Sequence, residues 1–95
     1  MNLKKYTNNK LNWKLYKAVH GNSGVTQYTI NDDYVGVRFK GEDRYSYFYD
    51  IDRIEREHVE AMKNFALKGE RLSSYISRHE EVRDFAIKVP NELLK

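Results

Sequence analysis

Three tyrosines occupy every second position of one short segment, and two cations lie just before it. Tyr45, Tyr47 and Tyr49 would point to one side of a β-strand, because side chains alternate between the two faces of a strand. Arg38 and Lys40 precede them in the chain. Aromatic rings stack on unpaired bases, at about 1–3 kcal/mol for each base, while cations contact the phosphates. The pattern predicts a surface for RNA or single-stranded nucleic acid.

Other reactive residue types lack the spacing that a catalytic or metal site needs. His58 and His79 lie on the apolar stripes of two predicted helices, so they could approach one another in the interior. No third ligand accompanies them at a recognisable spacing, and we interpret both as packed, hydrogen-bonded histidines. The chain also has no Ser/His/Asp spacing and no glycine-rich phosphate loop. We therefore predict that the protein is not an enzyme and uses no metal or other cofactor.

Positive charge is concentrated in the first third of the chain. Residues 1–31 contain five lysines and no acidic residue, whereas residues 32–95 contain 12 Lys and Arg against 14 Asp and Glu. A basic arm on a near-neutral body suits a polyanion, because each phosphate contact releases a counterion. The same lysines would also keep this segment soluble. We include Lys14 and Lys17 in the predicted nucleic-acid-binding set.

The length of 95 residues corresponds to one small domain. There is no cysteine, so disulfide bonds and thiolate ligands are excluded. No apolar stretch approaches the roughly 18 residues of a membrane span, and the first residues are not typical of a signal peptide. We expect a cytoplasmic protein without membrane contact.

Hydrophobic periodicity places strands before helices. Residues 25–30, 34–40 and 45–51 show strand patterns, and a glycine-containing turn at 41–44 makes the last two an antiparallel hairpin. Earlier in the chain, the even spacing of Leu11, Trp13, Leu15 and Val19 favours a strand, although part of this segment also fits a short helix.

After residue 51 the period changes from two to 3.6. Asp52, with a glutamate three residues later, is typical of a capping box, so the first helix should begin there and end before Gly69. A second amphipathic helix follows, capped by Ser73 or Ser74, and Pro90 marks its end.

These elements predict an α+β fold in the order β-β-β-α-α. A small antiparallel sheet of about three strands would be followed by two amphipathic helices packed on one face. We divide the chain into a lysine-rich N-terminal extension (1–22), the α+β domain (23–89) and a C-terminal tail (90–95).

The register of the hairpin decides which face carries the tyrosines. A loop of two or four residues leaves them on the open face, whereas a loop of three or five residues places them under the helices. Gly41 is suited to the first central position of a two-residue type II′ turn, which favours the open face, but a β-bulge would reverse it. The predicted binding residues of the open face are Tyr34, Arg38, Lys40, Tyr45, Tyr47 and Tyr49.

Three features of residues 23–79 occur together. They are the strand Val35-Gly36-Val37-Arg38-Phe39 with the turn after it, Tyr45-Ser46-Tyr47, and Lys68-Gly69 leading to Tyr75-Ile76. In these features the chain resembles the KTSC domain, a small bacterial domain that occurs alone or at the C-terminus of some lysyl-tRNA synthetases. The resemblance implies an α+β fold and suggests RNA binding, and it implies no catalytic residues.

The sequence thus predicts a non-catalytic binding module, with RNA or single-stranded nucleic acid as its partner. Two alternatives stay open. The first is an accessory, phage-derived or inhibitory protein that docks on a protein partner through Trp13, Leu15 and Tyr16. The second is a small-nucleotide pocket between sheet and helices, with tyrosine stacking on the base and arginine holding a phosphate. The sequence does not specify an oligomeric state.

Overall fold

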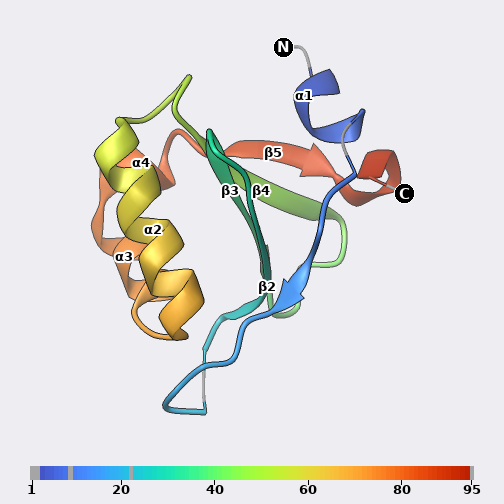
Figure 1. Ribbon diagram of the computed structural model, residues 1–95. Coiled ribbons are helices and arrows are strands. Elements are labelled where there is room, and N and C mark those ends of the chain that lie inside the picture. Colours follow the sequence, from blue (N-terminus) through green and yellow to red (C-terminus); the bar gives the residue numbers. More distant parts are fainter. Residues whose placement is uncertain (1–2, 9, 22, 95) are drawn as a thin grey trace.

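The computed structural model describes residues 3–8, 10–21 and 23–94, in which five strands form one antiparallel sheet (Figure 1). The order of the strands in the sheet is their order in the chain. The predicted α+β class with an antiparallel sheet is confirmed, but the sheet has five strands instead of about three. Of the two further strands, one lies within residues 11–19, whose spacing favoured a strand, and the other, at residues 87–90, was not predicted. The strands are β1 (Lys14–Leu15), β2 (Val25–Ile30), β3 (Tyr34–Phe39), β4 (Tyr45–Asp50) and β5 (Ile87–Pro90).

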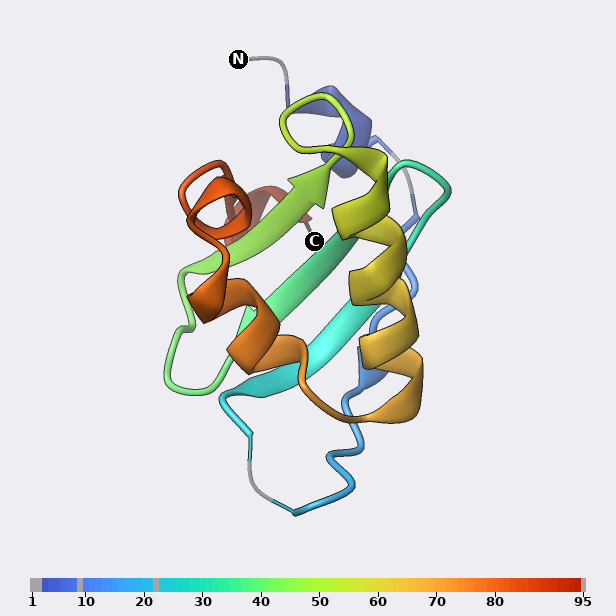
Figure 2. The same ribbon diagram turned by 90° about the vertical axis from the view of Figure 1, so that its left-hand side faces the viewer.

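Both faces of the sheet are covered. Figure 2 shows α2 (Arg56–Lys68), α3 (Leu72–Arg78) and α4 (Glu80–Arg83) lying across one face. The other face carries the N-terminal segment with α1 (Lys4–Thr7) and the 3₁₀ turn η1 (Asn91–Leu94) (Figure 1). None of the described helices is both long and apolar enough to cross a membrane.

The end of the chain differs from the prediction of one long second helix. The backbone becomes extended at His79, which separates α3 from α4, and Pro90 ends a strand rather than a helix. Ile87 and Val89 are buried while Lys88 between them is exposed, which is the period-two pattern of a strand. The segment becomes β5 because β4 offers it a free edge.

The first helix begins later than the predicted capping box. The Asp52 side chain caps no helix; instead its own backbone N–H donates to the Asp50 carboxylate, at 2.9 Å. Residues 51–54 form a turn, and α2 begins at Arg56. Its predicted end is confirmed: Gly69 adopts φ +72° and its N–H donates to the carbonyls of the last helical turn. The predicted serine cap of the second helix is absent, since Arg71 precedes α3 and no side chain caps it.

The β3–β4 loop sets the register opposite to the one we favoured. Val35 pairs with Tyr49 and Val37 with Tyr47, which leaves a five-residue loop, 40–44, between the strands. Gly41 does adopt a positive φ of +82°, but it does so within this longer loop. An odd number of loop residues moves every β4 side chain to the other face. The prediction that the tyrosines point away from the helices is therefore wrong.

The main hydrophobic core lies between the sheet and the helices. Val35 and Val37 of β3 are fully buried there beneath Val59 and Met62 of α2. Tyr49, only 2% exposed, belongs to the same core. Tyr49 thus fills a core position that an aliphatic residue could otherwise take.

A second, aromatic core lies on the opposite face, beneath the N-terminal segment. The rings of Tyr6 and Phe48 stack with centroids 4.2 Å apart, and Tyr34 packs edge-on against both. Gly36 leaves room for Phe48, because a methyl group at Gly36 would lie 2.7 Å from the phenylalanine ring and from a Thr29 methyl carbon. The described residues before β1 therefore complete the fold, and they do not form a free basic arm.

A buried carboxylate fastens this segment to the sheet. Asp50, at the end of β4, is fully buried, and its oxygens lie 2.9 Å from Lys5 Nζ and 2.6 Å from the Tyr6 hydroxyl, which donates to it. Burial alone would raise the pKa of Asp50, but the hydrogen bonds from Tyr6, the Asp52 backbone and Lys5 lower it below its usual value. Lys5 is consequently paired with a carboxylate of the protein itself, which leaves its charge less available to a phosphate.

Candidate functional site

Two of the predicted binding tyrosines are core residues. Tyr34 is 1% exposed and packs in the aromatic core, and Tyr49 is 2% exposed under the helices. Burial raises the pKa of Tyr49, so its hydroxyl stays protonated. Neither ring is accessible for stacking on a ligand.

Arg38 is also committed within the protein. Its guanidinium carbon lies 3.9 Å from the centre of the Trp13 ring, and its Nε donates to the Ser46 hydroxyl at 3.0 Å. A second nitrogen donates to Gln27 at 3.2 Å, and partial burial lowers the pKa of the guanidinium. Arg38 binds the tryptophan of the N-terminal segment, on the face opposite the tyrosines.

The predicted lysines do not join the tyrosines on one surface. Lys14 lies in β1 and Lys17 two residues after it, at one edge of the sheet, whereas Tyr45, Tyr47 and Tyr49 lie in β4, three strands away. With a strand spacing of about 4.8 Å, this separation is about 14 Å. Lys40 is exposed in the hairpin loop. The eight predicted residues therefore do not form a single site.

A smaller aromatic and cationic surface does exist at the other edge of the sheet. Tyr45 and Tyr47 are partly exposed on the helix side, and Lys88 of β5 lies directly opposite Tyr47 in the ladder. Lys88 Nζ lies 4.3 Å from the centre of the Tyr45 ring, a cation–π contact. Among the described residues Lys88 forms no ion pair.

Next to these residues a groove of about 410 Å³ opens between the sheet and the last two helices. This volume lies within the range of small-molecule sites. Figure 2 shows the β3–β4 loop extending beyond α3 at this end of the sheet. The aromatic wall comes from strands and the aliphatic wall from the helical layer. The lining residues are Phe39, Glu42, Tyr47, Tyr49, Ile76, Arg83, Ala86 and Lys88.

Some polar groups of the groove already have hydrogen-bond or ion-pair partners within the protein, and others do not. The Tyr47 hydroxyl donates to Glu42 Oε1 at 3.2 Å; burial, and then the Glu42 charge, raise the pKa of Tyr47. Arg83 lies 3.0 Å from Asp84 and also donates to the Ser77 carbonyl, so its charge is partly neutralised. Lys88 is thus the cation best placed to meet an anionic ligand in this groove.

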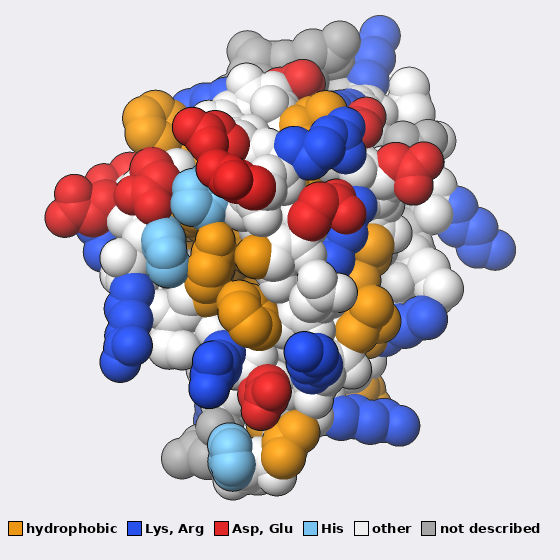
Figure 3. Space-filling view, turned by 60° about the vertical axis from the view of Figure 1, so that its left-hand side comes forward, with side chains coloured by type: hydrophobic (Ala, Val, Ile, Leu, Met, Phe, Trp, Pro, Cys, Tyr) orange, Lys and Arg blue, Asp and Glu red, His pale blue; other side chains and the backbone are white. Residues whose placement is uncertain are grey.

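The two histidines do approach one another, as the sequence indicated. Their ring centroids are 5.6 Å apart, and Figure 3 shows two adjacent histidines beside an apolar patch on the helix side. His58 Nδ1 lies 2.7 Å from the Tyr75 hydroxyl, and the Tyr75 ring stacks on His79 with centroids 4.0 Å apart. Glu81 lies 3.7 Å from His58 Nε2. Within the described residues, no group of three or more His, Cys, Asp or Glu side chains is arranged to hold a metal ion.

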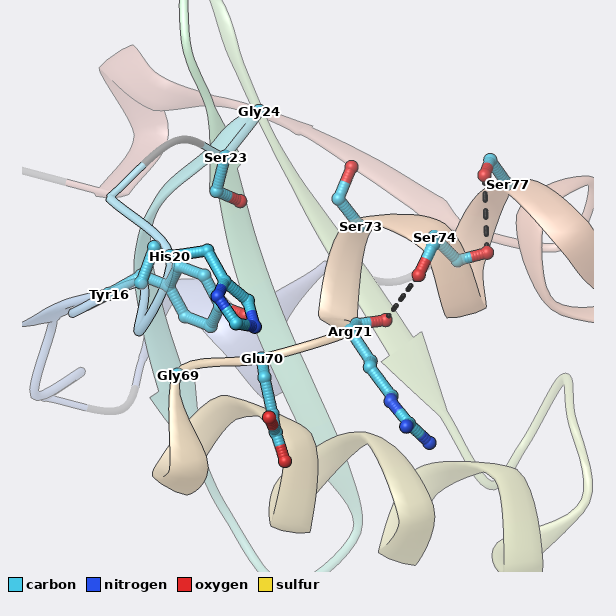
Figure 4. Close-up of a pocket in the computed structure, with 11 residues that line it drawn as sticks. Tyr16, His20, Ser23, Gly24, Gly69, Glu70, Arg71, Ser73, Ser74 and Ser77 are labelled. Atoms are coloured by element: carbon cyan, nitrogen blue, oxygen red, sulfur yellow. Dashed lines mark hydrogen bonds between the residues drawn. The ribbon is translucent and has the colours of Figure 1, made fainter.

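A polar cleft of about 450 Å³ lies between the loop before β2 and the turn that joins α2 to α3 (Figure 4). Four of its lining residues are serines, and His20 and Arg71 also contribute. Figure 4 shows the Arg71 side chain directed away from the hydroxyls of Ser23 and Ser73, so these polar groups do not converge on one point. The hydroxyls of Ser74 and Ser77 already donate to backbone carbonyls. We do not assign a binding role to this cleft.

Comparisons with protein-family models, curated proteins and solved structures find no match to this chain. The similarity to the KTSC domain therefore remains a prediction from the residues named above. Sequence reasoning also missed Lys88 as a neighbour of Tyr47, whereas Phe39 beside the tyrosines belongs to the five-residue-loop register that we did not favour. The alternation of Ile87, Lys88 and Val89 was the available signal, because it indicates a strand with its lysine on one face.

Proposed function

We propose that the protein is a non-catalytic module that binds an unpaired base of single-stranded nucleic acid in the groove beside β4. The observation that carries the proposal is the cross-strand placement of the partly exposed Tyr47 and of Lys88, which forms no ion pair with any described residue, in a groove that Phe39 also lines. A flat ligand with an attached phosphate matches that combination of a ring and a cation.

The geometry favours an unpaired base over a duplex. The groove is lined by the aromatic side chains of Phe39, Tyr47 and Tyr49, whereas duplex binding relies on cations spread along the phosphate backbone. Here the predicted Lys14 and Lys17 lie at the β1 edge of the sheet, Lys40 lies in the β3–β4 loop, and Lys5 is held by Asp50. Stacking would supply about 1–3 kcal/mol for each base with little sequence preference. We therefore expect weak, sequence-tolerant binding that depends on few nucleotides.

Fluorescence anisotropy with labelled single-stranded octanucleotides of mixed sequence, RNA and DNA, tests the proposal. We expect Tyr47→Leu to weaken binding about tenfold, or about 1.4 kcal/mol, while Tyr47→Phe retains the ring and most of the affinity. Lys88→Gln should reduce the slope of log affinity against log salt by about 0.7, one phosphate contact on a single strand. Lys14→Gln, at the far edge of the sheet, serves as the matched lysine control.

Nuclear magnetic resonance shifts should map to Phe39, Tyr47 and Lys88 on titration. The absence of binding in low salt, or equal losses for Lys14→Gln and Lys88→Gln, would contradict the proposal. A mononucleotide that binds as tightly as the octanucleotide would instead identify a small-nucleotide pocket in the same groove. That alternative is favoured by one observation, the position of the groove between sheet and helices with Arg83 at its rim.

A further inference from the structure

A second groove lies between the β1 edge of the sheet and the end of α2, and its volume is about 400 Å³. Figure 2 shows the last turn of α2 in front of this edge. It lies three strands away from β4 and the groove described there. None of the residues that line it is acidic; they are Lys14, Leu15, Lys17, Tyr28, Ala66 and Leu67.

Tyr28 lines this groove with a hydroxyl that has no partner among the described residues. The residue is only 8% exposed, and its ring packs edge-on against Tyr16 with centroids 6.4 Å apart. Every buried side-chain nitrogen or oxygen in the described part of the chain has a hydrogen-bond partner. A hydroxyl without a partner must therefore reach solvent, and for Tyr28 the groove is where it does so.

Two lysines share the groove with this hydroxyl. Lys14 lies directly opposite Tyr28 in the β1–β2 ladder, so both side chains leave the same face of the sheet, with Cβ atoms about 5 Å apart. Lys17 lines the groove from the segment after β1. Both lysines are exposed, and neither forms an ion pair or a hydrogen bond with a described residue.

The apolar wall of the groove comes from α2. Leu67 in the last turn of this helix is 65% exposed, and Ala66 lies beside it. The Leu15 side chain alternates to the opposite face of the sheet, because its partner in the ladder is Gln27. The groove thus combines two ammonium groups and one hydroxyl, all of them hydrogen-bond donors, with one aliphatic surface.

We propose that this groove binds the phosphate group of a small phosphate monoester, whose organic part contacts Leu67. A phosphate monoester carries about −1.5 to −2 charges at pH 7 and has three terminal acceptor oxygens. This matches the two ammonium groups of Lys14 and Lys17 and the hydroxyl of Tyr28. A phosphodiester or a carboxylate has a single charge and two free oxygens, so either would leave a cation unmatched.

The carbonyl end of α2 is the one unfavourable neighbour of an anion in this groove, because the C-terminus of a helix carries about half a negative charge. Its last carbonyls already accept hydrogen bonds: the Gly69 N–H donates to the carbonyls of Phe65 and Ala66, and the Glu70 N–H donates to that of Phe65. The two full positive charges of the lysines exceed the partial charge of the helix end. The groove therefore attracts an anion.

A nucleic acid fits the groove less well than a small monoester does. The Tyr28 ring is buried, so it presents its hydroxyl to the groove and not a face on which a base could stack. An internal phosphate of a nucleic acid is also a diester. Nucleic acid would therefore gain only the contacts of a singly charged phosphate here.

Titration of the protein with n-butyl phosphate, followed by nuclear magnetic resonance, tests this inference. We expect shifts centred on Lys14, Tyr28 and Leu67. Methyl n-butyl phosphate keeps the butyl group but is a diester with one free oxygen fewer, and it should bind at least about tenfold more weakly. Inorganic phosphate lacks the contact with Leu67 and should bind about fourfold more weakly, the equivalent of one buried CH₂ group.

Three variants separate the groups that bind the phosphate. Tyr28→Phe keeps the buried ring and should weaken binding of n-butyl phosphate about tenfold, as the loss of a hydrogen bond to a charged group does. The double variant Lys14→Gln/Lys17→Gln should weaken it at least about tenfold. The matched control is Lys10→Gln/Lys40→Gln, which removes the same charge from exposed lysines outside the groove and should leave binding unchanged. Circular dichroism verifies that the variants are folded.

Five outcomes would each overturn the inference: no shift at the groove, equal binding of the diester, full affinity in Tyr28→Phe, equal losses in the two double variants, or tighter binding here of a 5′-phosphorylated octanucleotide than of n-butyl phosphate. n-Butyl phosphate has no ring that could stack on Tyr47, so this test does not depend on the groove beside β4. An octanucleotide without a terminal phosphate contains only diesters, so Lys14→Gln remains the control for that groove. The two proposals can therefore fail separately.

Discussion

Replacing Asp50 by asparagine should destabilise the whole domain. The buried carboxylate receives hydrogen bonds from the Tyr6 hydroxyl and the Asp52 backbone and pairs with Lys5 at 2.9 Å. Asparagine has nearly the same volume, but it has one acceptor oxygen instead of two and no charge. The substitution therefore removes the electrostatic attachment of the N-terminal segment while it leaves the packing almost unchanged.

The expected loss in the free energy of unfolding follows from the burial of Asp50. Removing one partner of a buried ion pair costs about 3–5 kcal/mol. The Lys5 side chain keeps 31% of its surface exposed and can regain water contacts, so we take the lower end, about 3 kcal/mol. With a urea m-value of about 1.5 kcal/mol/M for a domain of this size, the midpoint of unfolding should fall by about 2 M.

Urea unfolding followed by circular dichroism measures this loss at pH 7. The matched control is Asp52→Asn: its carboxylate lies 3.3 Å from the same Lys5 nitrogen, but its side chain is 71% exposed. An exposed pair contributes at most about 1 kcal/mol. If Asp50→Asn lost no more stability than Asp52→Asn, the buried carboxylate would not hold the N-terminal segment, and our account of the second face would be refuted.

Two further predictions concern pH and backbone conformation. Because the folded-state pKa of Asp50 is depressed, its contribution to stability is present above the unfolded value of about 3.9 and is lost as pH falls through the folded pKa. Urea midpoints between pH 5 and 2 should therefore fall less steeply for Asp50→Asn than for the natural sequence, and parallel curves would contradict this. Gly69→Ala and Gly41→Ala both place alanine at a positive φ, at a cost of about 1–2 kcal/mol each. At Gly69 the new methyl carbon would also lie 1.9 Å from the Lys17 carbonyl oxygen, whereas at Gly41 it would meet no atom within 4 Å. Gly69→Ala should therefore lose about 1–3 kcal/mol more than Gly41→Ala in the same urea assay. Equal losses would show that the backbone around Lys17 moves aside freely.

For the candidate site, it was harder to predict which face of the sheet carries a side chain than to predict where the strands lie in the sequence. Tyr45, Tyr47 and Tyr49 share one face, as their spacing requires, but the face is the one under the helices. The face depends on whether the hairpin loop has an odd or an even number of residues. The loop has five residues instead of the two that we predicted, and Gly41 is compatible with both lengths. The helices bury Tyr49, whereas Tyr45 and Tyr47 on the same face are partly exposed.

Local periodicity was sufficient for the elements whose patterns are long and bounded by clear stops. The alternation through residues 25–50 predicts the three central strands, and the apolar stripe that ends at Gly69 predicts α2, because these signals arise from neighbours in the chain. β1 keeps only two residues of the segment 11–19, whose spacing favoured a strand but also fitted a short helix in part. β5 is four residues long, so its alternation is a weak signal that the prediction of a long second helix overrode. They are strands because β2 and β4 present edges that must be paired.

From its sequence alone, then, the chain determines an antiparallel hairpin sheet followed by amphipathic helices, and a tyrosine-bearing strand at its centre. Only the tertiary structure decides that residues 3–8 and 10–13 cover the second face, that Asp50 holds this segment there, and that Lys88 lies opposite Tyr47. The physical reason is that these contacts join residues about 40 positions apart. Their formation depends on which surfaces remain uncovered once the central strands have paired, and no local pattern encodes that.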